Sequence, residues 1–278
     1  ISTACPTPVG AGSDLSRLVA GANGMLGFSH QTEARANWIQ SRHDVHTIAG
    51  IFGVFAEAGV NVAMGPPSPL LAAATAEVRQ RTGRTFHWII TPNFELTHDG
   101  PDFDVAARAF DHARDAGATF CWPHQCVTDR LYDGLTGRIR HMDRLCAMMR
   151  DRRLVPGLST HNPEVVVAAD KTGLDVASYI VIYNAAGFLM PVEIDWTAGV
   201  IHKAAKPVTT IKPLAAGRLM PYVGLPFAWA TLRDRDLVTV GVTTEDEARE
   251  AIEISLASLQ RRHPDMKLQV TRSKQGLI

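Results

Sequence analysis

The chain has 278 residues, 46% of them hydrophobic, and carries 28 basic and 28 acidic side chains. This length fits one (β/α)8 barrel or two small domains, and the hydrophobic content is enough for a large core. Because the charges balance, the composition gives no reason to expect nucleic acid or an anionic membrane surface as a partner. A small molecule is the expected ligand.

The cysteines and the hydropathy pattern point to a compartment. The four cysteines include no CxxC pair, no segment has the features of a signal peptide, and no apolar run is long enough to span a bilayer. We therefore expect a cytoplasmic protein with reduced thiols.

Buried strands and helices alternate along the chain after a polar lead over residues 1–16. The pattern predicts eight strands, at residues 17–21, 60–64, 85–91, 118–122, 154–161 (including the following loop), 178–182, 207–211 and 237–241. It predicts eight helices, at residues 44–58, 68–81, 105–116, 137–152, 163–171, 193–203, 226–233 and from 244 onward. The basic tail over residues 261–278 is expected to pack outside the barrel or over one end.

The first of these helices shows how the assignments are made. Val45, Ile48, Phe52 and Phe55 recur at helical spacing, and Gly59 suits the helix end. Regular alternation of helices and strands implies a parallel sheet, and eight such units in one domain's length favour a closed barrel over an open sheet. The sequence therefore predicts an α/β fold, a single (β/α)8 TIM barrel over residues 1–278.

The stretch from Gly157 to Glu164 changes from a strand to the start of a helix within a few residues. Asn162 is a good N-cap and Pro163 fits the first helical position, which leaves His161 on a short loop at the carboxyl end of a strand. Capping alone explains Asn162 and Pro163. In parallel α/β folds, however, catalytic side chains collect at this end of the strands.

Polar side chains follow most of the other predicted strands in the same way. Each has a structural explanation on its own, such as a turn for His30 or a solvated surface position for Lys212. Their shared place at one barrel mouth favours a functional site. The expected catalytic residues are His124, His161 and Lys212, and the expected substrate-positioning residues are Asn23, His30, Glu95, Tyr183 and Asn184.

Two kinds of chemistry suit this set. In the first, Glu95, His124 and His161 end three successive strands and bind Zn²⁺ or a similar divalent ion, which leaves a fourth position for water or substrate. Such a metal would polarise a carbonyl or activate a water. In the second, Lys212 is an amine nucleophile or an electrostatic clamp, and His124 or His161 is the general base or acid.

Four motifs occur in an order that resembles the aldo/keto reductase superfamily over roughly residues 15–259. They are Trp122-Pro123-His124, Val181-Ile182-Tyr183-Asn184, Pro213-Leu214-Ala215-Ala216-Gly217-Arg218-Leu219 and Val238-Thr239-Val240-Gly241-Val242. The resemblance implies an aldo/keto-reductase-like TIM barrel and places His124 where the family keeps an active-site histidine.

The rest of that family's catalytic tetrad is missing. Its reductases use an aspartate and a tyrosine after the second strand and a lysine on the third, and the tyrosine donates the proton with its pKa lowered by the lysine. Here the second strand runs through Val62–Pro67 with neither residue, and the third ends at Thr91-Pro92. After the eighth strand, where the family binds the extra phosphate of NADPH with basic residues, Glu245–Glu247 would repel it. NADPH is therefore not expected.

The leading hypothesis is an enzyme on this barrel that performs non-redox chemistry. It would be a lyase, an isomerase or a hydrolase acting on a small polar carbonyl or sugar-like substrate. One alternative is an NADPH-dependent reductase with a rearranged proton donor such as Tyr183. Another is a barrel that binds a small molecule without turning it over.

Overall fold

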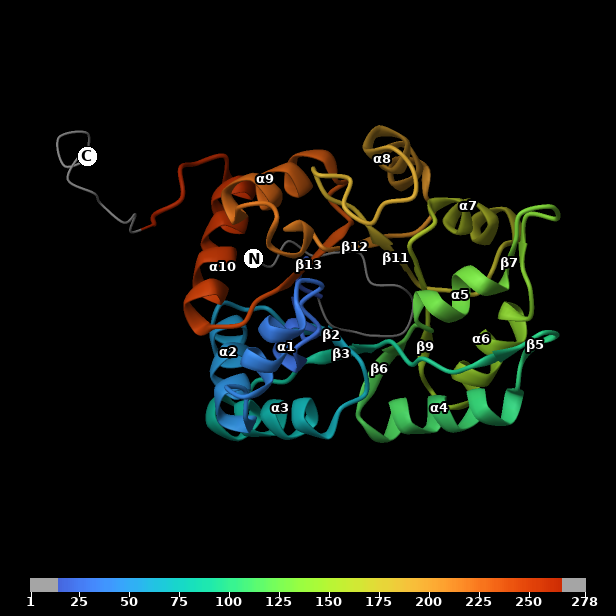
Figure 1. Ribbon diagram of the computed structural model, residues 1–278, viewed down its shortest axis with the longest axis horizontal. Coiled ribbons are helices and arrows are strands. Elements are labelled where there is room, and N and C mark those ends of the chain that lie inside the picture. The colour runs from blue at the N-terminus through green and yellow to red at the C-terminus, as the bar shows by residue number, and fades with distance from the viewer. Residues whose placement is uncertain (1–14, 267–278) are drawn as a thin grey trace.

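The computed structural model describes residues 15–266, and it contains a sheet of nine parallel strands surrounded by helices (Figure 1). Every pairing within this sheet is parallel. The strands, in the order in which they lie in the sheet, are β10 (Leu158–Thr160), β11 (Tyr179–Ile182), β12 (Val208–Ile211), β13 (Leu237–Gly241), β1 (Leu18–Gly21), β2 (Val62–Gly65), β3 (His87–Ile90), β6 (Ala118–Cys121) and β9 (Val155–Pro156).

The two ends of this sheet belong to one stretch of chain. β9 pairs with β6 and β10 pairs with β11, and Gly157 alone separates β9 from β10. The predicted fifth strand is thus split in two, and the sheet nearly closes on itself through it. The structure confirms the expected TIM barrel, with eight strand positions.

Ten α-helices lie within the described residues and pack around the strands (Figure 1). They are α1 (Glu33–Gln40), α2 (Val45–Glu57), α3 (Pro69–Thr82), α4 (Phe103–Asp115), α5 (Gln125–Leu131), α6 (Met142–Asp151), α7 (Pro163–Thr172), α8 (Ile194–Lys203), α9 (Pro221–Thr231) and α10 (Glu245–Gln260). Among these described helices, none is both long and apolar enough to cross a membrane. The predictions for residues 1–14 and 267–278 lie outside the described residues.

Several predicted boundaries were wrong for local reasons. The helix expected from residue 137 begins at Met142, because Tyr132–Asp133 (β7) and Arg138–Ile139 (β8) form a hairpin whose turn is held by the Asp133 carboxylate. The helix expected at 226–233 runs from Pro221 to Thr231. Helices α1 and α5 were not predicted, nor was the hairpin of β4 (Leu96–Thr97) with β5 (Gly100–Pro101).

The strands separate two apolar cores because successive side chains point to opposite faces. Along β11, Ile180 joins the cluster inside the barrel, whereas Tyr179 and Val181 join the larger cluster between strands and helices. Eight more buried residues fill the interior: Leu15, Val19, Val62, Met64, Ile89, Phe120, Trp122 and Leu237. The interior is therefore packed with side chains, and a site built from the strand ends lies at an end of the barrel.

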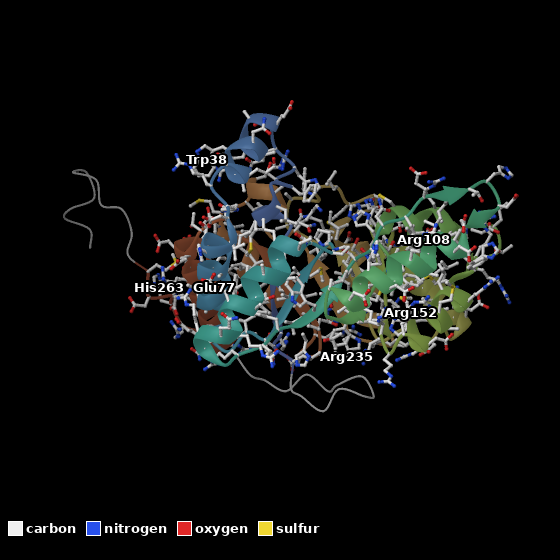
Figure 2. The ribbon with its side chains drawn as sticks, turned by 90° about the horizontal axis from the view of Figure 1, so that it is seen from below. Trp38, Glu77, Arg108, Arg152, Arg235 and His263 are labelled. Carbon is white, nitrogen blue, oxygen red and sulfur yellow. The ribbon has the colours of Figure 1, made fainter. Side chains whose placement is uncertain are left out.

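A buried ion pair ties the strands together at the amino end. Asp236 is fully buried, and its carboxylate accepts hydrogen bonds from the Arg233 guanidinium at 2.7 and 2.8 Å and from the Val208 backbone N–H at 2.8 Å. It thereby joins the start of β12 to the turn before β13. Figure 2 shows this end of the barrel near Arg235, on the side of the molecule away from Trp38 of α1.

Candidate active site

Three histidines and a lysine lie at the carboxyl end of the barrel. His30 follows β1, His124 follows β6, His161 follows β10 and Lys212 follows β12. Burial is the largest cause of the lowered pKa of each imidazole, and the positive charge of Lys212 comes second for all three; His124 and His30 also lower the pKa of His161. The fold thus brings these four predicted residues into one electrostatic cluster.

Lys212 has an unusual backbone and an unusual environment. Its φ is +59°, in the left-handed region, and it is followed by Pro213. The side chain is half-buried, burial lowers its pKa, and within residues 15–266 it forms no hydrogen bond or ion pair. Non-glycine residues with positive φ concentrate at functional sites, and His30 shares this conformation with φ +52°.

His161 is held by a carboxylate outside the predicted set. The Asp129 carboxylate of α5 accepts a hydrogen bond from the His161 backbone N–H at 3.1 Å and another from the Thr160 hydroxyl. Burial first, and then the charge of Lys212, lower the pKa of His161 to about 4. Its imidazole is therefore neutral at neutral pH and able to accept a proton.

The ring of His124 caps the first turn of α5. Its Nδ1 accepts a hydrogen bond from the Cys126 backbone N–H at 3.3 Å, so in the neutral ring the proton resides on Nε2. Burial, followed by the charge of Lys212, lowers the pKa of His124. The cluster therefore contains a neutral imidazole whose N–H is available as a donor.

Two loops meet beside Lys212 and bring in an arginine that was not predicted. Gln31, next to His30, donates a hydrogen bond from Nε2 to the Ala216 carbonyl oxygen at 2.9 Å. The guanidinium of Arg218 lies 4.0 Å from the ring centre of Phe188 and donates to the Ala215 carbonyl oxygen at 3.2 Å. Burial, then the charge of Lys212 and last that of Arg218 lower the pKa of His30, and the hydrogen bond from Gln31 to Ala216 joins the loops that carry His30 and Arg218.

The structure places Tyr183 and Asn184 in structural roles. Tyr183 is 1% exposed, and its hydroxyl donates to Thr231 Oγ1 of α9 at 3.0 Å. It points outward because side chains two residues apart along a strand share a face, and Tyr179 and Val181 face the helices. Asn184 is fully buried and holds its own loop: its Oδ1 accepts from the Phe188 backbone N–H at 2.9 Å, and its Nδ2 donates to the Phe188 carbonyl at 3.1 Å.

Glu95 and Asn23 are exposed in loops at the same end of the barrel. The proposed metal site required Glu95 to approach His124 and His161. Among residues 15–266, no group of three His, Cys, Asp or Glu side chains is arranged to hold a metal ion. Glu95 lies in the loop before β4, and Glu95, His124 and His161 form no such group.

The segment after β13 is acidic at the position where the sequence resemblance to aldo/keto reductases predicts basic residues. The Glu247 carboxylate accepts hydrogen bonds from the Thr243 backbone N–H at 2.6 Å and from the Thr243 hydroxyl at 2.9 Å. Glu245 and Asp246 share Arg249. The Glu247 carboxylate thus occupies the Thr243 N–H just before α10, and three acidic side chains lie in the first turn of that helix, where an anion would otherwise be favoured.

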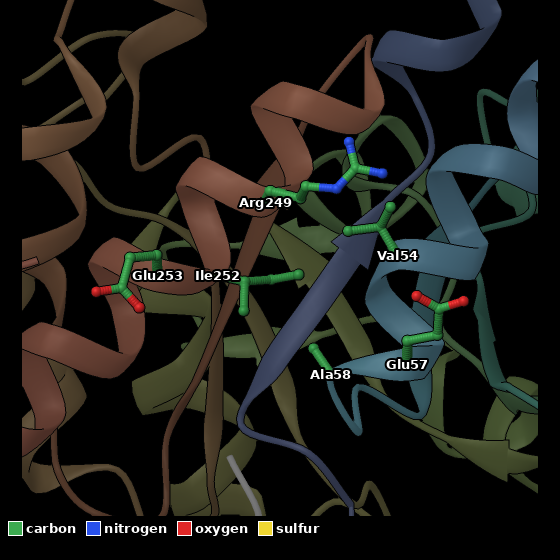
Figure 3. A pocket seen from close by; sticks show the side chains of 6 residues that line it. All are labelled: Val54, Glu57, Ala58, Arg249, Ile252 and Glu253. Carbon is green, nitrogen blue, oxygen red and sulfur yellow. The ribbon is translucent and has the colours of Figure 1, made fainter. Parts of the chain in front are cut away.

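Two surface hollows lie elsewhere, in the helix layer. One of about 320 Å³ lies between α2 and α10, where Val54, Glu57, Arg249 and Glu253 line it (Figure 3). The other, of about 600 Å³, lies between α9 and α10 and includes Trp229. Neither is lined by a residue of the histidine and lysine cluster.

The fold has solved counterparts. An aldo-keto reductase from Pseudomonas aeruginosa superposes with a TM-score of 0.61 and 16% identity, covering 89% of this chain and 93% of that one. An aldo/keto reductase from Brucella melitensis superposes with a TM-score of 0.57 and 11% identity, covering 94% of this chain and 98% of that one. A protein assigned as 2,5-diketo-D-gluconic acid reductase B superposes with a TM-score of 0.58 and 13% identity, covering 98% of this chain and 95% of that one.

No family model and no curated protein matches the sequence. At these identities the structural likeness defines the fold alone. The chain has an aldo/keto-reductase-like TIM barrel, as the sequence motifs implied.

Proposed function

We propose that this barrel is an enzyme that performs non-redox acid–base chemistry on a small polar carbonyl or sugar-like substrate at its carboxyl end. The observation that carries the proposal is the grouping of His124, His161 and Lys212 on three separate strand ends. Converging titratable groups with displaced pKa values are typical of active sites. The similarity to enzymes of the aldo/keto reductase fold adds support.

Each of the three side chains has a role in such a reaction. The neutral imidazole of His161 accepts a proton from the carbon next to the substrate carbonyl. The Nε2–H of His124 donates to the oxyanion that develops on the carbonyl oxygen, and Lys212 acts as an electrostatic clamp on the substrate.

Proton exchange tests this proposal across several substrate classes at once. The purified protein is incubated in D₂O with a panel of hydroxyketones, 2-oxo acids and sugar phosphates, and the loss of the α-proton signal is followed by NMR. We expect exchange on at least one compound, and its loss in His161→Gln and His124→Gln. His98→Gln, at an exposed loop histidine, is the matched control and should exchange at the wild-type rate. Exchange that survives both active-site changes would refute the assignment.

A second candidate is a nicotinamide-dependent reductase, which the likeness to solved aldo/keto reductases favours. The hydroxyl of Tyr183 bonds to Thr231 in the outer layer, so the proton donor would have to be His124 or Lys212. Fluorescence titration with NADPH and NADH separates the two candidates. Tight cofactor binding with carbonyl-dependent oxidation would support the reductase and overturn the non-redox proposal. Ligand binding with neither reaction would indicate a barrel that only binds.

A further inference from the structure

We propose that the substrate carries an oxyanion, a carboxylate or a phosphate, which binds between Lys212 and Arg218 beside His30. This inference rests on the proposed function only for the part of the substrate that reacts. The anion-binding half is argued from the charges of the described residues and can be tested in the absence of turnover.

Lys212 differs from the other sheltered cations in having no partner. The Arg233 guanidinium pairs with Asp236 at 2.7 Å, and Arg152 pairs with Asp111 at 3.0 Å. The ammonium of Lys212 contacts no carboxylate and no carbonyl among residues 15–266. An unpaired charge that has lost part of its hydration is costly, and a bound anion would offset that cost.

The loop that follows Lys212 carries a second cation. The Arg218 guanidinium donates to the Ala215 carbonyl oxygen, and the Ala215 N–H in turn donates to the Lys212 carbonyl oxygen; within the described residues Arg218 forms no ion pair. The Asp129 carboxylate lies on the β10 side of the mouth, where the Thr160 hydroxyl engages one oxygen and the His161 backbone N–H the other. Lys212 and Arg218 are therefore two cations on one loop that form no ion pair among the described residues.

The geometry of Arg218 suits recognition of an oxyanion. Stacking on Phe188 and one hydrogen bond to the Ala215 carbonyl fix the plane of its guanidinium. The remaining N–H groups of the fork have no partner among the described residues and are available for carboxylate or phosphate oxygens. The loop that carries Arg218 is constrained by the left-handed Ala215 and Ala216, with φ values of +48° and +55°.

The position of this charged edge orients a substrate. Because Lys212 and His30 lie on the β12 and β1 side of the mouth and His124 and His161 on the β6 and β10 side, an anion held at the first pair directs the carbonyl toward the second. The predicted substrate class is a small carbonyl compound with a terminal carboxylate or phosphate.

Anion binding to the full chain tests the inference. Thermal unfolding and histidine-ring NMR are followed during titration with inorganic phosphate, and separately with acetate, at constant ionic strength. Saturable stabilisation of the wild type is expected, with affinity at least about tenfold weaker in Lys212→Met and Arg218→Met. Lys171→Met, at an exposed lysine of α7, is the control and should bind as the wild type does. Melting curves without ligand establish that each variant is folded.

The outcomes separate this inference from the proposed function. Saturable binding of phosphate alone, or of acetate alone, supports the site and identifies which oxyanion the substrate carries. No saturable binding of either probe, or equal binding by the wild type and both active-site variants, overturns the inference. Binding that depends on Lys212 with no proton exchange sustains the anion site and counts against the enzyme. Exchange on uncharged ketones as fast as on their anionic analogues sustains the enzyme and overturns the anion site.

Discussion

Gly157 lies directly against the indole of Trp122, and a Cβ atom at residue 157 would overlap Cδ1, Nε1 and Cε2 of that ring. Trp122 is 3% exposed inside the barrel, whereas Gly157 separates β9 from β10 on the strand through which the sheet closes. The absence of a side chain at residue 157 therefore lets the split strand pass over a packed aromatic ring.

Gly157→Ala is predicted to destabilise the protein by about 1–3 kcal/mol, because a rigid ring in a packed interior cannot yield to the new methyl group. Urea unfolding measures the change. The control is Gly199→Ala on α8, where no atom lies within 4 Å of the added Cβ and the change should be neutral or stabilising. Equal effects of the two substitutions would show that the contact with Trp122 does not limit closure.

Tyr183→Phe is predicted to leave catalysis unchanged. The lost hydroxyl bonds only to Thr231 Oγ1 in the outer layer, so the expected cost is about 1 kcal/mol of stability. Steady-state kinetics and urea unfolding of the same variant provide both values. A large fall in kcat with little loss of stability would restore Tyr183 as a proton donor and with it the rearranged reductase.

The pH dependence of stability is predicted to include a contribution from His161. The ordinary histidine pKa is 6.5 and that of folded His161 is about 4, so between these values the unfolded state binds more protons. The stability that the neutral ring contributes is complete above pH 6.5 and is lost as the pH falls toward 4. The difference between the unfolding free energies at pH 7 and pH 5 should be smaller in His161→Gln than in the wild type. His98→Gln should keep the wild-type difference between the two pH values.

Lys212→Met is predicted to stabilise the ligand-free protein by about 1 kcal/mol at pH 7, since it removes a partly buried ammonium that has no partner. The same substitution should raise the pKa values of His30, His124 and His161, because the charge of Lys212 lowers all three. NMR titration of the ring protons measures the second effect. Unchanged histidine pKa values would show that these side chains do not form one cluster in solution.

Asp236→Ala is predicted to cost about 3–5 kcal/mol, because it leaves the Val208 N–H without its acceptor and the Arg233 guanidinium without its counter-charge. The matched control is Asp234→Ala, two residues earlier, whose carboxylate is fully exposed and lies 3.9 Å from Arg17. That change should have no measurable effect on urea unfolding. A comparable loss in both variants would argue against the buried pair as the source of stability.

Much of the candidate site could be read from the sequence. Residues that follow a buried strand in a parallel barrel must lie at its carboxyl end, and this rule placed His30, His124, His161 and Lys212 together. The same rule could not decide which way a side chain points. Tyr183 and Asn184 both end β11, yet one packs against α9 and the other stabilises its own loop.

The contacts that complete the site come from segments far apart in the chain. Asp129 reaches His161 across 32 residues, and Gln31 reaches Ala216 across 185. No pattern among neighbouring residues predicts either hydrogen bond, because the partners lie far apart in the sequence. Asp129, for example, is one polar residue of a short helix. Arg218 stood in a motif that was noted for the fold, and its position after the seventh strand was the signal that could have placed it at the mouth.

The sequence by itself determined the eight strand positions and the end of the barrel at which chemistry can occur. Both follow from local periodicity and from strand direction, which are properties of neighbouring residues. Only the tertiary structure decided that Gly157 splits one strand over Trp122, that Glu95, His124 and His161 are not arranged to hold a metal ion, and that Lys212 has no counter-charge among residues 15–266. Each of these features depends on which side chains from distant parts of the sequence come into contact. Packing, burial and electrostatic interactions between them are therefore set by the fold and not by local sequence.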